Sequence, residues 1–141
     1  MPSARGVTPA PTAITLHQKS RILEIEYADG RNFRLPCEFL RVFSPSAEVR
    51  GHGPGQEVLQ TGKRDVEIRA IEPVGSYAVQ LKFSDGHDTG IYSFDLLYEY
   101  GLKQARMWSE YLQRLGQAGA SRKPGAGPRG YLPRQVALRW A

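Results

Sequence analysis

Short runs of alternating apolar and polar residues, separated by turn residues, dominate the first hundred positions. In residues 21–27 (RILEIEY), Leu23, Ile25 and Tyr27 alternate with Ile22, Glu24 and Glu26, the two-residue period of a half-buried β-strand. Similar short runs occupy residues 14–20, 32–35, 65–75, 77–83 and 88–92. Asp-Gly pairs within 28–31 and 84–87 are typical of hairpin turns. The pattern therefore predicts antiparallel hairpins.

Apolar residues at helical spacing follow each set of strands. Pro36 favours the first position of a short helix over 36–43, which places Phe39, Leu40 and Phe43 near one face. Residues 44–64 then read as a long, polar and glycine-rich connection.

A second helical region begins near residue 94. Ser93 is expected to cap it, with Asp95 in its first turn, and Gly101 is expected to end it. Residues 104–115 form a further helical stretch, whose apolar stripe comprises Trp108, Tyr111, Leu112 and Leu115.

Residues 23–40 and 79–97 share one plan of strand, Asp-Gly turn, returning strand and helix start. Gly30 and Gly86 are 56 positions apart, and the two helix starts are one position further apart than this. We interpret this as an internal duplication of a β-hairpin-plus-helix unit. The expected fold is a single small α+β domain of antiparallel hairpins with the helices on one side.

Length and composition limit the class of protein. The 141 residues provide for one domain over 13–116, between a flexible N-terminus (1–12) and a flexible Gly/Pro-rich tail (117–141). No apolar run is long enough to span a membrane, and residues 1–13 lack the apolar stretch of a secretory signal. The single cysteine, Cys37, permits no internal disulfide, so a cytoplasmic protein is expected.

The net charge of +5 is confined to the C-terminal residues. Residues 117–141 hold five basic residues and no acid, which leaves 14 basic and 14 acidic residues in 1–116. Five dispersed charges without a folded basic face are weak evidence for nucleic-acid binding, so nucleic acid is not an expected partner.

His87 follows the second Asp-Gly turn and precedes Asp88 and Thr89. Histidine titrates near neutrality, and a flanking carboxylate can orient it as a metal ligand or a base. In the first repeat the same position is Arg31, which favours an exposed turn exit that tolerates different residues. Both interpretations of His87 stay open.

His52 is surrounded by Gly51, Gly53 and Gly55, which allow sharp turns or a close approach of a partner. The segment lacks the features of a phosphate loop or a dinucleotide fingerprint. Cys37 lies in an apolar stretch where a buried, inert thiol is expected. No nucleophile and base can be paired from the sequence, so no enzymatic activity is expected.

Three separated blocks, 35–56, 68–97 and 108–115, resemble small bacterial proteins homologous to the N-terminal domain of γ-butyrobetaine hydroxylase. The resemblance covers about residues 13–115. This domain also precedes the 2-oxoglutarate, Fe(II)-dependent dioxygenase domain of the hydroxylase, and it is attached to P-loop iron–sulfur scaffold proteins of the Mrp type. The resemblance implies a non-catalytic module, because the chain is too short to include the dioxygenase domain.

The resemblance also implies a place for zinc, which the hydroxylases hold with clustered cysteines after the first helix and a histidine in the later hairpin. His87 matches that histidine, but residues 44–48, where the cysteines would fall, contain none. Tetrahedral zinc would then need a substitute set from His17, His52, His87 and Cys37. No cofactor is therefore expected, and a divalent metal ion is left as an alternative.

Two hypotheses for function follow. The first is a binding or adaptor module, with iron–sulfur assembly or delivery machinery as the partner suggested by the resemblance. Its expected contact surface comprises Ser44, Pro45, Ser46, Glu48, Gly51, His52, Gly53, Gly55, Asp85, Gly86, His87, Asp88 and Thr89. The second is a metal-binding protein in which His52, His87 and Asp88 hold Fe(II) or zinc, since a mixed nitrogen and carboxylate set suits divalent ions such as Fe(II).

Overall fold

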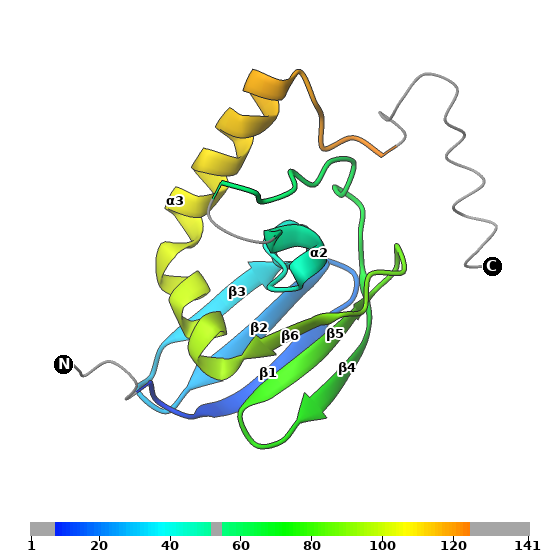
Figure 1. Ribbon diagram of the computed structural model, residues 1–141. Helices are drawn as coiled ribbons and strands as arrows, with labels where there is room; N and C mark the ends of the chain where they lie inside the picture. The colour runs from blue at the N-terminus through cyan, green and yellow to red at the C-terminus, as the bar shows by residue number, and fades with distance from the viewer. Residues whose placement is uncertain (1–7, 52–54, 125–141) are drawn as a thin grey trace.

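Two three-stranded antiparallel sheets and three helices make up the part of the chain that the computed structural model describes, residues 8–51 and 55–124 (Figure 1). The first sheet has the order β1 (Pro11–His17), β2 (Ile22–Tyr27), β3 (Asn32–Pro36), and the second β4 (Ile68–Val74), β5 (Ala78–Phe83), β6 (Gly90–Ser93). Helix α1 (Cys37–Val42) follows the first sheet, α2 (Ala47–Arg50) lies in the connection, and α3 (Phe94–Ala118) follows the second. The prediction of a small α+β domain built from antiparallel hairpins is confirmed.

The two sheets repeat the same strand pairing, apart from one extra residue between β5 and β6. Ile25 of β2 pairs with Phe33 of β3, and Leu81 of β5 pairs with Gly90 of β6, at equivalent positions of the two repeats. The first strand of each sheet also has its irregularity at the same place, between Pro11 and Ala13 in β1 and between Ile68 and Ala70 in β4. Because independent hairpins would not share a bulge position, this agreement supports the duplication.

Both Asp-Gly turns use the same hydrogen bonds. The Asp29 carboxylate accepts from the Arg31 amide at 2.9 Å, and the Asp85 carboxylate accepts from the His87 amide at 3.1 Å. Gly30 and Gly86 have φ angles of 91° and 90°, which a residue with a Cβ rarely adopts. The hairpin turns predicted from these Asp-Gly pairs are therefore confirmed.

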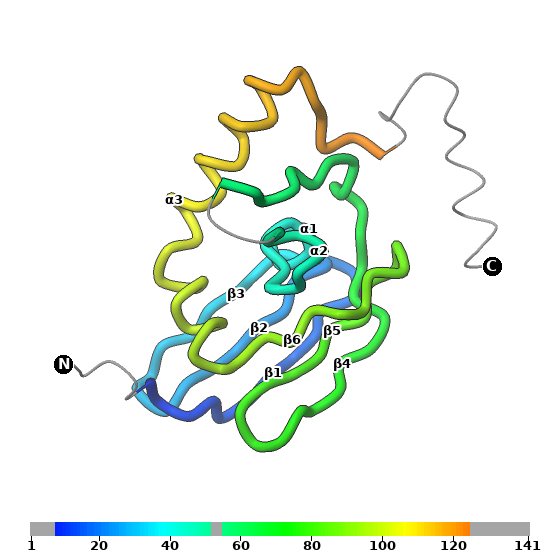
Figure 2. The backbone as a smooth tube through the Cα atoms, viewed as in Figure 1, coloured from blue at the N-terminus to red at the C-terminus, as the bar shows by residue number. Residues whose placement is uncertain are grey.

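One hydrophobic core joins both sheets with α1 and α3, and the backbone trace shows the two sheets close together with α3 along them (Figure 2). Every residue of α1 is buried. The largest fully buried side chains of this core are those of Tyr92, Phe39, Leu23, Ile25, Leu35, Leu40, Ile68, Leu81 and Leu97. Cys37 is buried among them, and burial raises the pKa of its thiol, as expected for an inert cysteine.

The helix of each repeat contacts the turn of the other repeat. Tyr98, the fifth residue of α3, donates a hydrogen bond to Asp29 of the first turn at 2.6 Å. Arg41, the fifth residue of α1, donates to Asp85 of the second turn at 2.8 Å. The two repeats thus make equivalent contacts with each other, and the helix of each repeat packs against the hairpin of the other.

The prediction that Gly101 ends a helix is wrong, because α3 includes Gly101 within its 25 residues and has its left-handed C-cap at Gly119. A Cβ at Gly101 would overlap the Phe33 ring, so this glycine allows α3 to approach β3. Ser93 caps the helix as predicted, accepting from the Leu96 amide at 3.0 Å. Of the predicted stripe, Leu112 is instead exposed.

Two smaller expectations also differ from the structure. Pro36 is the last residue of β3 and the N-cap of α1, so the helix begins at Cys37, one position later than expected. The connection 44–64 includes the short helix α2, which Ser46 caps by accepting from the Glu48 amide at 3.2 Å. Among the described residues, no helix combines the length and apolar character that a bilayer span requires.

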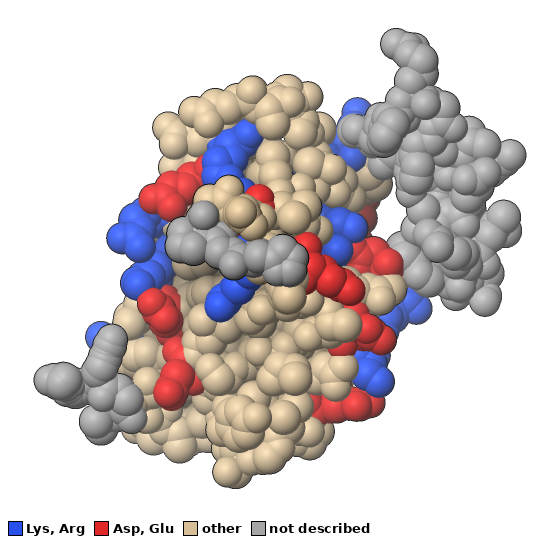
Figure 3. All heavy atoms as spheres, viewed as in Figure 1, with Lys and Arg blue, Asp and Glu red and all other residues tan. Residues whose placement is uncertain are grey.

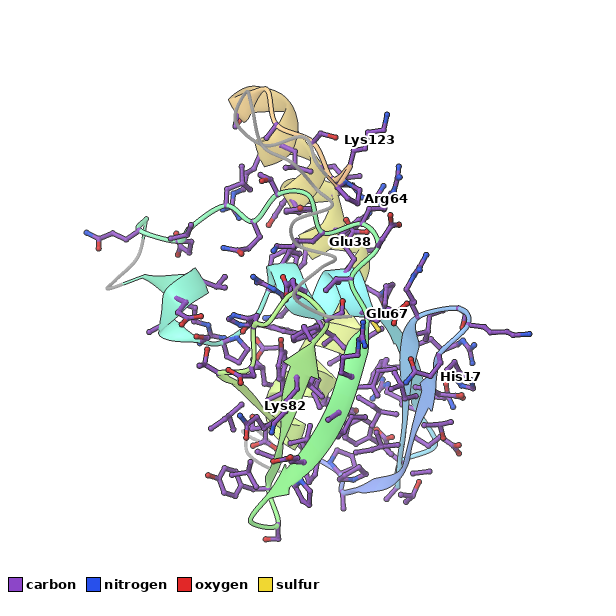
Figure 4. The ribbon with its side chains drawn as sticks, turned by 90° about the vertical axis from the view of Figure 1, so that its right-hand side faces the viewer. His17, Glu38, Arg64, Glu67, Lys82 and Lys123 are labelled. Carbon is purple, nitrogen blue, oxygen red and sulfur yellow. The ribbon has the colours of Figure 1, made fainter. Side chains whose placement is uncertain are left out.

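The chain after α3 packs back onto the folded body as far as residue 124. Arg122 makes two hydrogen bonds, at 2.7 and 2.8 Å, to the buried Glu38 carboxylate and lies over the Trp108 ring. Its carbonyl also accepts from the Arg64 amide, and Figure 4 shows Arg64 near Lys123. Part of the expected tail therefore belongs to the fold, whereas residues 1–7 and 125–141 lie outside the described residues.

We expect Gly101→Ala to destabilise the protein by about 1–3 kcal/mol, because the new methyl group would force the Phe33 ring or α3 to move. The matched control is Gly116→Ala in the same helix, where a Cβ has open space and the better helix propensity of alanine should stabilise by about 0.5–1 kcal/mol. Urea unfolding of both variants measures the difference. Equal effects of the two substitutions would contradict the close packing of α3 on β3.

Candidate functional site

The segment after α1 and the β5–β6 hairpin, which the sequence suggested as one contact surface, meet in the structure. The Ser44 hydroxyl lies 2.8 Å from Nε2 of His87, and the Ser46 hydroxyl lies 2.7 Å from that of Thr89. Thr89 also donates to the Glu48 carboxylate at 3.3 Å. These contacts fix the start of α2 against the hairpin.

His87 is buried, so the exposed position expected from its counterpart Arg31 is wrong for this repeat. Its side chain is 3% exposed, whereas that of Arg31 is 55% exposed. Room for the imidazole network comes from Gly90 of β6, where a Cβ would lie 2.6 Å from the Ser44 hydroxyl. At the equivalent place in the first repeat, the Phe33 ring fills the space against Gly101.

Both ring nitrogens of His87 have partners. Nε2 faces the Ser44 hydroxyl, and Nδ1 lies 3.1 Å from a carboxylate oxygen of Glu48. Because the Ser44 oxygen already accepts from the Ser46 amide at 3.2 Å, its hydrogen is available to Nε2. The neutral tautomer with its proton on Nδ1 then satisfies every group, donating to Glu48.

Burial lowers the pKa of His87, and the nearby positive charge of Arg41 lowers it further, against the opposing effect of Asp85 and Glu48. The folded protein therefore favours the neutral imidazole. A neutral ring with its proton on Nδ1 is compatible with the Ser44–His87–Glu48 hydrogen bonds.

Asp85, in the β5–β6 turn, forms salt bridges with two cationic side chains. Its carboxylate accepts from Lys63 at 2.6 Å and from Arg41 at 2.8 Å, and Arg41 also donates to Gln60. Burial alone raises the pKa of Asp85, but the Lys63 hydrogen bond and the charges of Arg41 and Lys63 outweigh it, so the pKa is lowered. The sequence did not single out Arg41 or Lys63, because only the fold brings them to the turn.

The other predicted surface residues divide by exposure. Pro45, Gly51 and Asp85 are half-buried, and Ser44, Ser46 and His87 are buried. The exposed members are Glu48, Gly55, Gly86, Asp88 and Thr89. His52 and Gly53 lie outside the described residues. The accessible part of the surface is therefore its edge, along α2 and the tip of the hairpin.

The zinc site that the resemblance implied does not fit these residues. Ser44 and Ser46 occupy the segment expected to hold thiolates, and serine hydroxyls are not the ligands of structural zinc. His17 lies on β1, where it contacts Glu24, and Figure 4 shows it on the far side of the sheets from α2. Within residues 8–51 and 55–124, no three His, Cys, Asp or Glu side chains group to hold a metal ion.

The Ser44–His87–Glu48 chain has the order of a serine-hydrolase triad, which no sequence signal indicated. Its geometry is that of a structural hydrogen-bond network, because Ser44 is only 1% exposed and its oxygen already accepts from the Ser46 amide. A nucleophile must reach the substrate carbonyl, and the buried Ser44 hydroxyl points at the hairpin.

An open groove of about 680 Å³ adjoins this network, between α2, residues 57–60 and α3. Its apolar lining includes Val42, Phe43, Val49, Val58, Tyr100 and Tyr111. The two tyrosine hydroxyls donate to the Phe43 and Gln60 carbonyls at 2.7 Å, which holds the groove walls together. Its charged lining residues are Arg50, Glu57 and Arg114.

Comparisons with known proteins agree with this fold. A family model described as gamma-butyrobetaine hydroxylase-like, N-terminal, matches residues 14–98. Two solution structures determined by NMR are 45% and 50% identical, with TM-scores of 0.73 and 0.74, over 89% and 91% of this chain and 98% and 96% of theirs. No match to a curated protein was found.

A crystal structure from Acidithiobacillus ferrooxidans, described as a protein with unknown function of the DUF971 family, is also similar. It is 42% identical, with a TM-score of 0.53, over 62% of this chain and 86% of its own. The resemblance inferred from the three sequence blocks is therefore confirmed.

We expect the free energy of unfolding to decrease as the pH falls from about 7.5 to about 5, partly because of His87. The folded pKa lies below the ordinary value of 6.5, so the unfolded chain binds a proton first and the contribution of neutral His87 is lost below that value. Urea unfolding across this range should show a flatter pH dependence for His87→Gln. An unchanged slope in His87→Gln would contradict the buried neutral imidazole.

Proposed function

The chain belongs to the gamma-butyrobetaine hydroxylase-like, N-terminal family, and on this basis we propose that it is a non-catalytic module that binds a protein partner. The observation that carries the proposal is the apolar groove beside α2, which leaves Val58 53% exposed at its rim. Exposed apolar side chains around a defined groove are typical of interaction sites. The family model that matches describes the N-terminal domain alone and no dioxygenase domain.

The wall of the groove is preformed. Ser46 caps α2, Ser44 contacts His87, and the Val58 amide donates to the Val49 carbonyl at 2.7 Å. These bonds hold α2 and residues 57–60 in place before any partner binds. A rigid site loses less conformational entropy on association, which favours affinity.

We propose an iron–sulfur assembly or delivery protein as the partner. The support is the resemblance to a domain that is attached to iron–sulfur scaffold proteins, since a domain fused to a partner in one protein is a candidate to bind it as a separate chain in another. The proposed contact surface joins the groove to the exposed edge formed by Glu48, Asp88 and Thr89.

Metal binding by His52, His87 and Asp88 stays an alternative prediction. His52 lies outside the described residues, and the carboxylate that contacts the His87 ring is Glu48 rather than Asp88. A metal ion at His87 would have to displace either Ser44 or Glu48 from the imidazole.

Capture experiments with the full chain test the binding module. We expect Val58→Asp to remove the specific partner from an extract of the source organism, because a carboxylate at the rim interrupts the apolar contact. The matched control is Tyr77→Asp, at a side chain that is 60% exposed between β4 and β5. Mass spectrometry should identify an iron–sulfur assembly protein that the control retains, and an identical set of captured proteins for both variants would contradict the proposed surface.

A serine-directed fluorophosphonate tests whether the chain lacks a reactive Ser44. We expect no adduct in the intact mass of the native protein, because the Ser44 hydroxyl is buried and faces the His87 ring. The positive control is a known serine hydrolase treated in parallel. A stoichiometric adduct that disappears in Ser44→Ala would establish a reactive serine and contradict the non-catalytic proposal.

A further inference from the structure

The charged residues of the groove indicate what kind of segment it would bind, an inference that rests on the proposed function. Arg50 ends α2 and Arg114 lies on α3, and both are exposed. Within residues 8–51 and 55–124, neither side chain lies within salt-bridge distance of a carboxylate. The hydrogen bond of Arg50 to the Tyr100 hydroxyl, at 3.5 Å, is at the limit of such a contact.

Several other cations of the described body are paired with carboxylates. Arg41 and Lys63 bind Asp85, Arg122 binds Glu38, and Lys103 binds Glu99 one turn away on α3. The two groove arginines thus keep guanidinium donors available, and guanidinium pairs with carboxylates through two parallel hydrogen bonds. Figure 3 shows both basic and acidic side chains over α3, where Lys103 pairs with Glu99 and Arg106 with Glu110.

The rest of the described lining is mostly apolar and includes one acid, Glu57, so the two arginines leave the groove with an excess of positive charge. Val49 and Tyr111 are buried in its floor, while Val58 remains exposed at the rim. An apolar side chain placed on this floor would bring its chain neighbours close to the guanidinium groups. We propose that the groove binds an acidic segment of the partner protein in which an aliphatic or aromatic side chain is flanked by carboxylates.

Two other occupants of the groove, the chain's own C-terminal residues and nucleic acid, fit its side chains less well than an acidic peptide does. The chain's own C-terminal residues 117–141 contain no acid and five basic residues, so they do not complement the two arginines. Nucleic acid would need aromatic faces for base stacking, but Tyr100 and Tyr111 are buried and their hydroxyls are bound to backbone carbonyls. An acidic peptide uses both the arginines and the apolar floor.

Selection from a phage-displayed library of random peptides, about 12 residues long, tests the proposal on the immobilised full chain. We expect an enriched motif with Asp or Glu next to Leu, Ile, Val or Phe. Fluorescence anisotropy with the most enriched peptide should give saturable binding that weakens at least about tenfold in Arg50→Ser/Arg114→Ser. The matched control is Arg69→Ser/Lys82→Ser, which removes two exposed or half-buried cations from β4 and β5.

Several results would overturn the inference. In the selection, these are no enriched motif or a motif without acids. In the binding assay, they are equal binding by the two double variants, or competition by decanoate at the same concentration as the peptide. Self-association of the chain through Arg50 and Arg114 would also overturn it. Circular dichroism and urea midpoints of the variants should match the unsubstituted protein, because both arginines are exposed. If Val58→Asp abolishes capture of a partner while the arginine variant binds normally, the binding module stands and the acidic segment is wrong.

Discussion

The helix of each repeat packs on the third strand and the Asp-Gly turn of the other repeat. The rest of the structure depends on this reciprocal packing. Arg41 of α1 reaches Asp85, while Tyr98 of α3 reaches Asp29. Each sheet alone would expose its inner face, and a unit of three strands and one helix buries too little apolar surface to be stable. The reciprocal packing makes one hydrophobic core from two units that are each too small to be stable alone.

The candidate site arises where the two repeats differ. Phe33 on β3 of the first repeat contacts Gly101 on α3 of the second, and this contact is apolar. Gly90 on β6 of the second repeat contacts Ser44, which follows α1 of the first, and the His87 network fills that space. A buried polar network of this kind fixes one arrangement of its segments, because each member would lose a partner if they separated.

The sequence predicted the elements whose signals are local. The alternation in 21–27, the two Asp-Gly turns and the Ser93 cap each involve neighbours in the chain, and all three are confirmed. The prediction that α3 ends at Gly101 was wrong. A glycine that ends a helix cannot be told from one that packs against an aromatic ring when only the sequence of the helix is known. The burial of His87 was missed for the same reason, since comparison with Arg31 ignores Ser44 and Gly90. Contact between residues 44–48 and 85–89 was only a hypothesis, since local pattern carries no distance information.

The Phe33–Gly101 contact has a consequence for synthesis of the chain on the ribosome. The two residues are 68 positions apart, so at 5–20 residues per second the first sheet emerges roughly 3–14 s before the helix that covers it. During that interval Phe33 and the inner face of β3 are exposed to water and to other nascent chains. The first half of this protein therefore exposes apolar surface that is prone to aggregation until α3 is synthesised and covers it.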